Sequence, residues 1–192
     1  VGAQQTFTHR LQLDVTSYGA APYQTLREYG VIPAEMHAEY GAIVEALLLK
    51  IADSFRHAGA PLIRRHGDCH AGNVLWNDAG PQIVDLDDCL MGPAVQDLWM
   101  LLSGERPQRT VQLSALLDGD EQFRSFDRRE LALIEPLRTL RLIHYSAWLA
   151  RRFADPIFPI NFPWFGSSDY WHGQVHMLEE QCEAMAEEPL WC

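Results

Sequence analysis

The clearest periodic pattern of the chain runs from Pro33 to about His57. Its apolar side chains recur every three or four residues, which places them on one stripe of a helix. They are Met36, Tyr40, Ile43, Leu47, Ile51 and Phe55. Pro33 suits the first turn of such a helix, and Gly59 suits the residue that follows its end. The pattern therefore predicts one long amphipathic helix.

The next segment has the pattern of short strands. PLIRRHGD at 61–68 indicates a strand that enters a loop. NVLW at 73–76 and QIVDLD at 82–87 indicate two strands joined by NDAGP, which is rich in turn formers. This predicts a β-hairpin with polar loops at its ends.

Most of the remaining chain has a helical pattern. Helices are predicted at 93–102, at 111–117, at 129–153 with a break near Pro136, and at 168–187. The segment ADPIFPINFPWFGSS is so rich in Pro and aromatic residues that no regular structure is expected there. Near the start, LQLDV indicates a short strand, and PYQTLREYG indicates a short helix that is stopped by Gly30.

Together these elements predict an α+β fold, mostly α-helical with a small β-hairpin. A chain of 192 residues with 47% hydrophobic residues is long and apolar enough for one domain with its own core. We assign residues 1–192 to that domain, with 1–30 as a linker or junction segment. No internal repeat is visible.

Charge and cysteines limit the partners and the compartment. A formal charge of −11 argues against nucleic-acid binding and favours a cationic or metal-bridged substrate. No apolar run is long enough to span a membrane, and VGAQQTFTHR does not resemble a signal peptide. The four cysteines form no C-x-x-C motif, and a domain of this size needs no disulfide. We expect a cytoplasmic monomer.

The most informative stretch is HGDCHAGN at 66–73, followed by VDLDD at 84–88. Asn73 follows Asp68 by five positions, and Asp85 follows Asn73 by twelve, at the end of a predicted strand. This spacing matches the kinase catalytic loop, in which an Asp base and an Asn precede a strand and a metal-binding Asp. HGD alone would be a weak signal, but three polar residues at two fixed spacings are a strong one.

The chemistry of phosphoryl transfer explains why these residue types occur together. The protein must position the reactants and neutralise charge rather than form covalent bonds. Asp68 can accept the proton of a substrate hydroxyl, and Asn73 and Asp85 offer the oxygen ligands that Mg²⁺ prefers. The sequence therefore predicts an ATP- and Mg²⁺-dependent phosphotransferase with Asp68 as base and a metal site at Asn73 and Asp85.

Four further residues are predicted to support this site. His66 is expected to hydrogen-bond the backbone near Asp85, and His70 to contact the loop or the substrate. In a strand, Asp87 would face the same side as Asp85, so it either reaches the metal or substrate or accepts backbone N–H groups. Asp97 lies among apolar neighbours in GPAVQDLW, where its carboxylate needs donors such as the N–H groups of the catalytic loop.

These motifs resemble the aminoglycoside phosphotransferase-like branch of the protein-kinase-like superfamily, whose HGDxHxxN signature and later Asp appear here as HGDCHAGN and VDLDD. The wider set, with GPAVQDLWMLL, IEPLR and FPINFPW, resembles the bacterial stress-response protein kinases of that branch. The resemblance spans about residues 62–171 and implies a kinase-like C-terminal lobe. It implies Asp68 as catalytic base, Asn73 and Asp85 as magnesium ligands, ATP as phosphate donor and a protein Ser or Thr as acceptor.

The chain departs from that family at the nucleotide site. No Gly-rich phosphate loop precedes the helix at residue 33. The only lysine, Lys50, lies in a predicted helix 18 residues before Asp68, so it cannot be the strand lysine of an N-terminal lobe. We therefore expect a C-terminal lobe without its N-terminal lobe, which folds but does not catalyse by itself.

Three alternatives stay open at this point. A small cationic alcohol, such as an aminoglycoside or choline, could replace the protein substrate. A two-metal phosphoesterase could use His70, Asp85 and Asp87 as ligands, although the later histidines fall in predicted helices. A kinase-like lobe could also act as a non-catalytic binding module.

Overall fold

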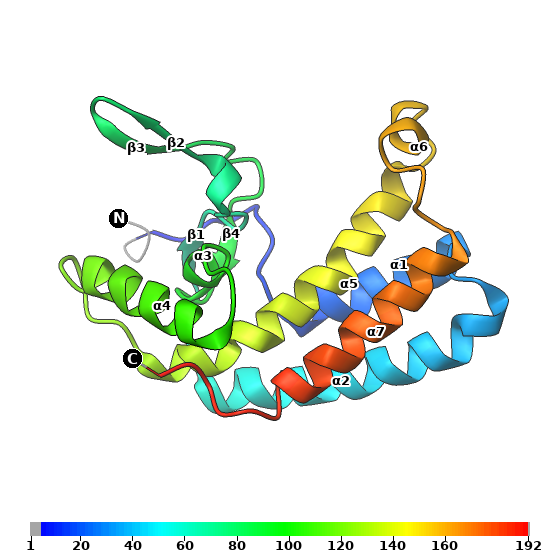
Figure 1. Cartoon of the computed structure of the whole chain (residues 1–192), viewed down its shortest axis with the longest axis horizontal. Helices are drawn as coiled ribbons and strands as arrows, with labels where there is room; N and C mark the ends of the chain where they lie inside the picture. Colours follow the sequence, from blue (N-terminus) through cyan, green and yellow to red (C-terminus); the bar gives the residue numbers. More distant parts are fainter. Residues whose placement is uncertain (1–4, 192) are drawn as a thin grey trace. The chain divides into compact units, whose positions relative to one another are not determined.

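The computed structural model describes residues 5–191, which form two compact units (Figure 1). Of these residues, unit 1 contains 5–13, 57–134 and 189–191, and unit 2 contains 14–56 and 135–188. The first four residues of VGAQQTFTHR and Cys192 lie outside the described residues. The assignment of 1–192 to one lobe, with 1–30 as a junction, stays a prediction.

Unit 1 contains two small antiparallel sheets. In the first, β1 (Ile63–Arg65) pairs with β4 (Leu90–Gly92). In the second, β2 (Val74–Asn77) and β3 (Gly80–Ile83) form the predicted hairpin, with Val74 opposite Ile83. The side chain of Asn77 accepts the N–H of Ala79 in the turn, as expected of a turn former. The predicted strand LQLDV is reduced to a single bridge between Gln12 and Met91.

The helices of unit 1 are short or differ in length from the prediction. They are the 3₁₀ turns η3 (Ala71–Asn73) and η4 (Arg128–Leu133) and the helices α3 (Gln96–Trp99) and α4 (Arg106–Asp120). Helix α3 replaces the longer helix predicted at 93–102. Helix α4 begins before the apolar pattern does, because Glu105 and Gln108 form a capping box that satisfies its first N–H groups.

Unit 2 is helical. It contains the π-helical turn η1 (Thr16–Ala20), α1 (Ala21–Tyr29), the 3₁₀ turn η2 (Ala34–Met36), α6 (Ile157–Asn161), α7 (Ser168–Ala184) and nearly all of α2 (His37–Ala58) and α5 (Ile134–Arg152). Gly30 ends α1 with a φ of 61°, as predicted. Pro136 does not break α5, because it lies in the first turn, where its missing N–H is not needed. The expectation of no regular structure at 154–168 was wrong, since α6 forms there.

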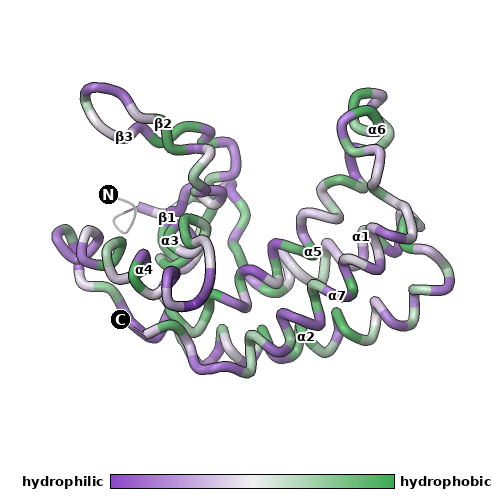
Figure 2. Tube along the Cα trace, viewed as in Figure 1, coloured by the Kyte–Doolittle hydropathy of each residue, from purple (hydrophilic) through white to green (hydrophobic). Residues whose placement is uncertain are grey.

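Apolar packing holds the helices of unit 2 together, and hydrophobic positions recur along them in Figure 2. Along α2 the predicted stripe is buried at Tyr40, Leu47 and Ile51. Val44 joins this stripe fully buried, whereas Ile43 is only half-buried, which corrects the prediction. Tyr40 packs edge-on against Trp171 of α7, with ring centroids 5.1 Å apart.

Polar bonds support the same packing between α5 and α7. The buried Ser146 hydroxyl lies 2.7 Å from the Tyr170 hydroxyl and donates to the Gln174 amide oxygen at 3.2 Å. These bonds satisfy a side chain that would otherwise be costly to bury in a helix interface.

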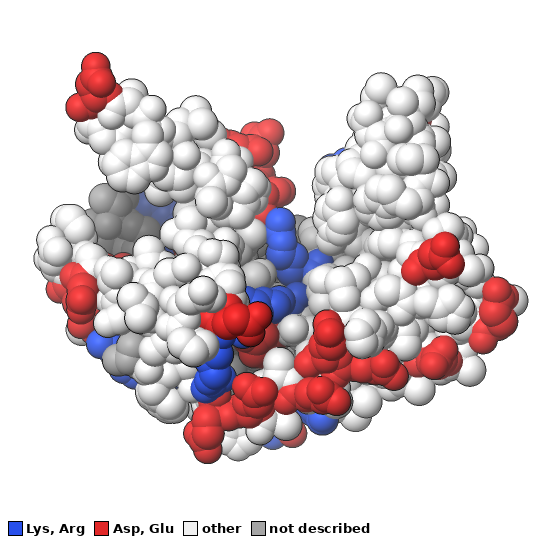
Figure 3. Space-filling model, in the orientation of Figure 1, with Lys and Arg blue, Asp and Glu red and all other residues white. Residues whose placement is uncertain are grey.

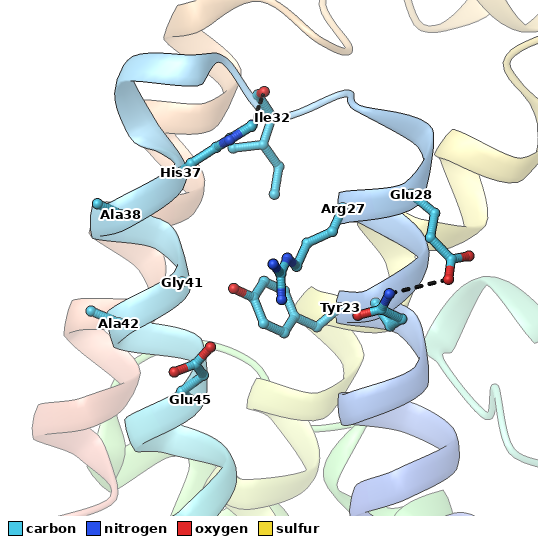
Figure 4. A pocket seen from close by; sticks show the side chains of 10 residues that line it. Tyr23, Arg27, Glu28, Ile32, His37, Ala38, Gly41, Ala42 and Glu45 are labelled. Atoms are coloured by element: carbon cyan, nitrogen blue, oxygen red, sulfur yellow. Dashed lines mark hydrogen bonds between the residues drawn. The ribbon is translucent and has the colours of Figure 1, made fainter.

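The surface of unit 2 has an acidic face and one notable pocket. Acidic side chains gather over α2 and α7 (Figure 3). The pocket, of about 650 Å³, lies between α1 and α2 and is lined by Tyr23, Arg27, Gly41 and Glu45 among others (Figure 4). None of the residues predicted to carry chemistry lines this pocket.

Two further findings concern the helices and the cysteines. Within residues 5–191, every helix is too short or too polar to cross a bilayer. Three of the four cysteines are described, and all three are free thiols: Cys69, Cys89 and Cys182.

Candidate active site

The loop that follows β1 turns sharply at Gly67. Its φ is 89°, and a Cβ at this position would lie 2.3 Å from the carbonyl oxygen of Asp88. Only glycine fits such a turn and such a close backbone approach. This approach brings the segment before β4 against the loop that carries Asp68.

Asp97 of α3 holds the start of this loop. Its Oδ2 accepts the N–H of His66 at 2.9 Å, and its Oδ1 accepts the N–H of Gly67 at 3.0 Å. These are the donors expected for this carboxylate from the sequence. Two backbone N–H groups bonded to the two oxygens of one carboxylate fix both the position and the orientation of the loop.

The buried ring of His66 connects the loop to the end of the hairpin. Its Nδ1 accepts the N–H of Asp68 at 3.3 Å, and its Nε2 lies 2.8 Å from the carbonyl oxygen of Val84. A carbonyl can only accept, so these partners select the neutral tautomer with its proton on Nε2. The expected hydrogen bond from His66 to the backbone beside Asp85 is therefore present.

Asn73 and His70 complete the surroundings of Asp68. The buried Asn73 donates its amide N–H to the carbonyl oxygen of Asp68 at 3.0 Å, so its amide oxygen points away from that carbonyl. The Nδ1 of His70 accepts the N–H of Gly72 at 3.0 Å, and its Nε2 lies 3.5 Å from Oδ2 of Asp68. The Asp68 carboxylate is thus partly buried beside an imidazole.

Asp85 does not end a strand, contrary to the prediction. Strand β3 stops at Ile83, and the pairing continues by one hydrogen bond from the N–H of Val84 to the carbonyl oxygen of Asn73, at 3.0 Å. Asp85 then takes a φ of 64°, and it is the one non-glycine residue in the described part with a positive φ. Such a conformation is costly outside glycine and tends to occur at functional sites. It leaves the Asp85 side chain exposed, directly after a residue held by both Asn73 and His66.

The strand argument for Asp87 was also wrong. The N–H of Cys89 bonds to the carbonyl oxygen of Leu86 at 3.3 Å, which makes 86–89 a turn without strand alternation. Asp87 is exposed in this turn, and Arg10 donates to its backbone carbonyl. A supporting role for the Asp87 side chain stays a prediction.

Sequence reasoning missed Gln96, the neighbour of Asp97. Its buried side chain donates from Nε2 to the carbonyl oxygen of Gly67 at 2.8 Å and accepts the indole N–H of Trp99 at 3.0 Å. The available signal was its place in GPAVQDLW, where it is a polar residue among apolar neighbours directly before Asp97.

Two further side chains surround the loop. Arg65 donates to the carbonyl oxygen of Ala94 at 3.3 Å and lies 3.8 Å from Asp97; burial lowers its pKa, which the charge of Asp97 opposes. Burial, followed by the charges of Asp97 and Asp68, raises the pKa of the Cys69 thiol to about 11. At neutral pH this buried thiol is protonated, so it is not a nucleophile.

The donor atoms of the site suit a magnesium ion that is completed by other ligands. Within residues 5–191, no three His, Cys, Asp or Glu side chains gather closely enough to hold a metal by themselves. Asn73 and Asp85 together offer one amide oxygen and one carboxylate, and Mg²⁺ is typically bound by few protein ligands with water and substrate phosphates.

Comparison with known proteins identifies the family of this site. The sequence profile of the phosphotransferase enzyme family matches residues 7–134, which include the HGDCHAGN loop and Asp97. The chain belongs to this family.

The chain is also similar to curated proteins that are named as kinases. The chain is 43% identical over 189 residues to stress response kinase A of Escherichia coli strain K12 and to that of Shigella flexneri. The same identity and length apply to serine/threonine protein kinase RdoA of Salmonella typhimurium. Each alignment covers 98% of this chain but 57% of the relative, so the chain spans little more than half the length of these curated relatives.

The tight turn at Gly67 generates a prediction about stability. Gly67→Ala should lower the free energy of unfolding by about 1–3 kcal/mol, because the new Cβ strains the backbone and meets the Asp88 carbonyl. Gly119→Ala is the matched control: it lies within α4, nothing lies within 4 Å of the added Cβ, and it should stabilise by up to about 1 kcal/mol. Urea unfolding measures both. A wild-type midpoint for Gly67→Ala would show that the turn does not constrain the loop.

Proposed function

We propose that the full-length protein is an ATP- and Mg²⁺-dependent kinase that transfers phosphate to Ser or Thr hydroxyls of proteins in a cytoplasmic stress response. The observation that carries this proposal is the hydrogen-bonded frame of the catalytic loop. His66 joins the backbone at Asp68 to Val84, and Asn73 bonds to both Asp68 and Val84. One connected set of hydrogen bonds thus joins Asp68, Asn73 and Val84, the residue before Asp85, and so links the three positions of the kinase pattern.

In this proposal Asp68 is the general base. Its backbone is held on both sides, because its N–H bonds to His66 and its carbonyl oxygen accepts from Asn73. These bonds fix the backbone of Asp68, and its partly buried carboxylate beside His70 would accept the proton of the attacking hydroxyl. Positioning of this kind is the main demand of phosphoryl transfer.

Asn73 and Asp85 would hold the magnesium ion. When bound, the ion neutralises charge on the nucleotide phosphates, which the acidic chain cannot do alone. The amide nitrogen of Asn73 is already engaged by Asp68, which leaves its oxygen to act as a ligand. Asp85, with its positive φ, has an exposed side chain and directly follows Val84, whose N–H bonds to the backbone carbonyl oxygen of Asn73.

The acceptor is proposed from the relatives and the charge. A relative named as a serine/threonine protein kinase favours a protein hydroxyl. A second candidate is a small cationic alcohol, because Asp85, Asp87 and Asp88 expose three carboxylates next to the hairpin. Both candidates share the base and the metal ligands and differ only in what binds beside them.

Replacing the base tests the chemistry in the full-length protein. Asp68→Ala should reduce phosphate transfer from ATP by about 10²- to 10⁴-fold, the usual contribution of a general base. Asp118→Ala, which removes an exposed carboxylate of α4, should leave the rate unchanged. Radiolabelled ATP and a generic acceptor protein measure the rate, and circular dichroism checks folding. An Asp68→Ala enzyme with wild-type turnover would rule out Asp68 as base.

The 192-residue chain by itself should fold without binding ATP tightly. One amide and one carboxylate bind Mg²⁺ weakly without nucleotide phosphates, and the chain has no Gly-rich phosphate loop. Thermal unfolding should therefore be cooperative, and millimolar ATP and Mg²⁺ should barely shift it, because stabilisation requires a ligand well above its dissociation constant. A shift of several degrees would show that this chain contains a complete nucleotide site.

A further inference from the structure

Glu130 is a buried carboxylate that the proposed mechanism does not use. It lies in η4, only 2% exposed, and its Oε2 accepts the N–H of Val95 at 2.9 Å. The backbone N–H of Ala94 also faces this carboxylate and, like that of Val95, lowers its pKa. A buried charge is costly unless donors satisfy it, so the two amides are its natural partners.

The two amides belong to the turn that leads into α3. This helix has only four residues, Gln96–Trp99, and too few internal hydrogen bonds to be stable by itself. Its own N-cap residue supplies no side-chain bond to the first turn. Glu130, distant in sequence, supplies the acceptor that this turn lacks, and so fixes where α3 begins.

Helix α3 in turn holds both backbone groups of Gly67. Asp97 accepts its N–H at 3.0 Å, and Gln96 donates to its carbonyl oxygen at 2.8 Å. The next residue is Asp68. Hydrogen bonds at Val95 and at Gly67, joined by the short backbone of α3, therefore connect Glu130 to the residue preceding the proposed base.

The charges around Glu130 support this arrangement. Burial raises the pKa of its carboxyl, while the hydrogen bonds from Val95 and Ala94, followed by the charges of Arg124 and Arg65, oppose that rise. Arg65 itself lies 3.8 Å from Asp97 and donates to the carbonyl oxygen of Ala94. The Glu130 carboxylate thus accepts an N–H of the same turn to whose carbonyl oxygen, at Ala94, Arg65 donates.

We infer that Glu130 is a positioning residue for the catalytic base: its carboxylate fixes the start of α3, and Gln96 and Asp97 pass that position to the loop at Gly67 and Asp68. The hydrogen bond described for Glu130 reaches the turn before α3 and not Asp68, Asn73 or Asp85. The inference rests on the proposed role of Asp68. It goes beyond that role by assigning the loop's geometry to a residue more than sixty positions away.

The test compares Glu130→Ala and Glu130→Gln with Glu121→Gln in the full-length protein. Glu121 is the matched control, because it pairs with Arg128 at 2.7 Å nearer the surface of the same unit. Glu130→Gln keeps the shape of the side chain and one acceptor oxygen, so it stays informative if Glu130→Ala fails to fold. Steady-state kinetics give kcat and the KM for ATP, and hydrogen exchange gives the protection of the amides at 66–68.

A positioning role predicts a kcat lowered on the order of 10- to 100-fold in Glu130→Ala, a smaller loss in Glu130→Gln and an unchanged KM, since small misplacements of catalytic groups have large effects on rate. It also predicts faster exchange at 66–68, while Glu121→Gln matches wild type in both measurements. Lower global stability with wild-type kcat and wild-type exchange at 66–68 would overturn the inference and leave Glu130 a purely structural residue.

The two measurements also separate this inference from the proposed function. If the wild-type protein transfers no phosphate, the proposed function fails, yet faster exchange at 66–68 in both Glu130 variants still supports the path from Glu130 to the loop. If phosphate transfer occurs and depends on Asp68 but not on Glu130, the function stands and the inference is wrong.

Discussion

The rest of the site depends on the imidazole ring of His66. One of its nitrogens accepts the N–H of Asp68, and the other donates to the carbonyl of Val84, the residue before Asp85. Both nitrogens are therefore occupied in one tautomer, and the ring sets the separation between the loop with the proposed base and the segment with the proposed metal ligand. Hydrogen bonds that fix catalytic groups in place provide the preorganisation that phosphoryl transfer requires.

The two units are stabilised in different ways. In unit 2, long helices bury apolar stripes, and residues such as Leu47 and Trp171 are fully buried. In unit 1, the elements around the site are three or four residues long, so backbone ladders alone cannot fix them. Buried polar side chains take over that task, above all Asp97, Gln96 and Glu130. Substitutions there should affect local geometry as much as stability, because a partly satisfied polar network is costly.

Local signals in the sequence predicted much of this structure. The turn formers of NDAGP gave the hairpin, Gly30 and Gly59 gave two helix ends, and a lone carboxylate among apolar neighbours pointed to the bonds of Asp97. These signals involve one residue and its immediate surroundings. The family was equally accessible, because the spacing of its polar residues lies within one short stretch of chain.

Features decided by distant neighbours could not be predicted in this way. Ile43 and Val44 lie roughly 50° to either side of the apolar stripe of α2, so helical periodicity cannot choose between them, and packing buries Val44. The apolar alternation of QIVDLD favours a longer strand, but the hydrogen bond from His66 ends the pairing after Val84. Glu130 carries no motif, and its role appears only when the fold brings it beneath Val95.

The central claim is that Asn73 and Asp85 belong to one magnesium site that this frame holds beside Asp68. The most direct measurement is a crystal structure of the full-length protein with a non-hydrolysable ATP analogue and Mn²⁺, located by its anomalous signal. The account predicts one ion bound to the amide oxygen of Asn73 and the carboxylate of Asp85, each at about 2 Å, and to the phosphates. An ion that lacks Asn73 or Asp85 as a ligand, or an Asp85 side chain turned away from Asn73 in the complex, would contradict the account.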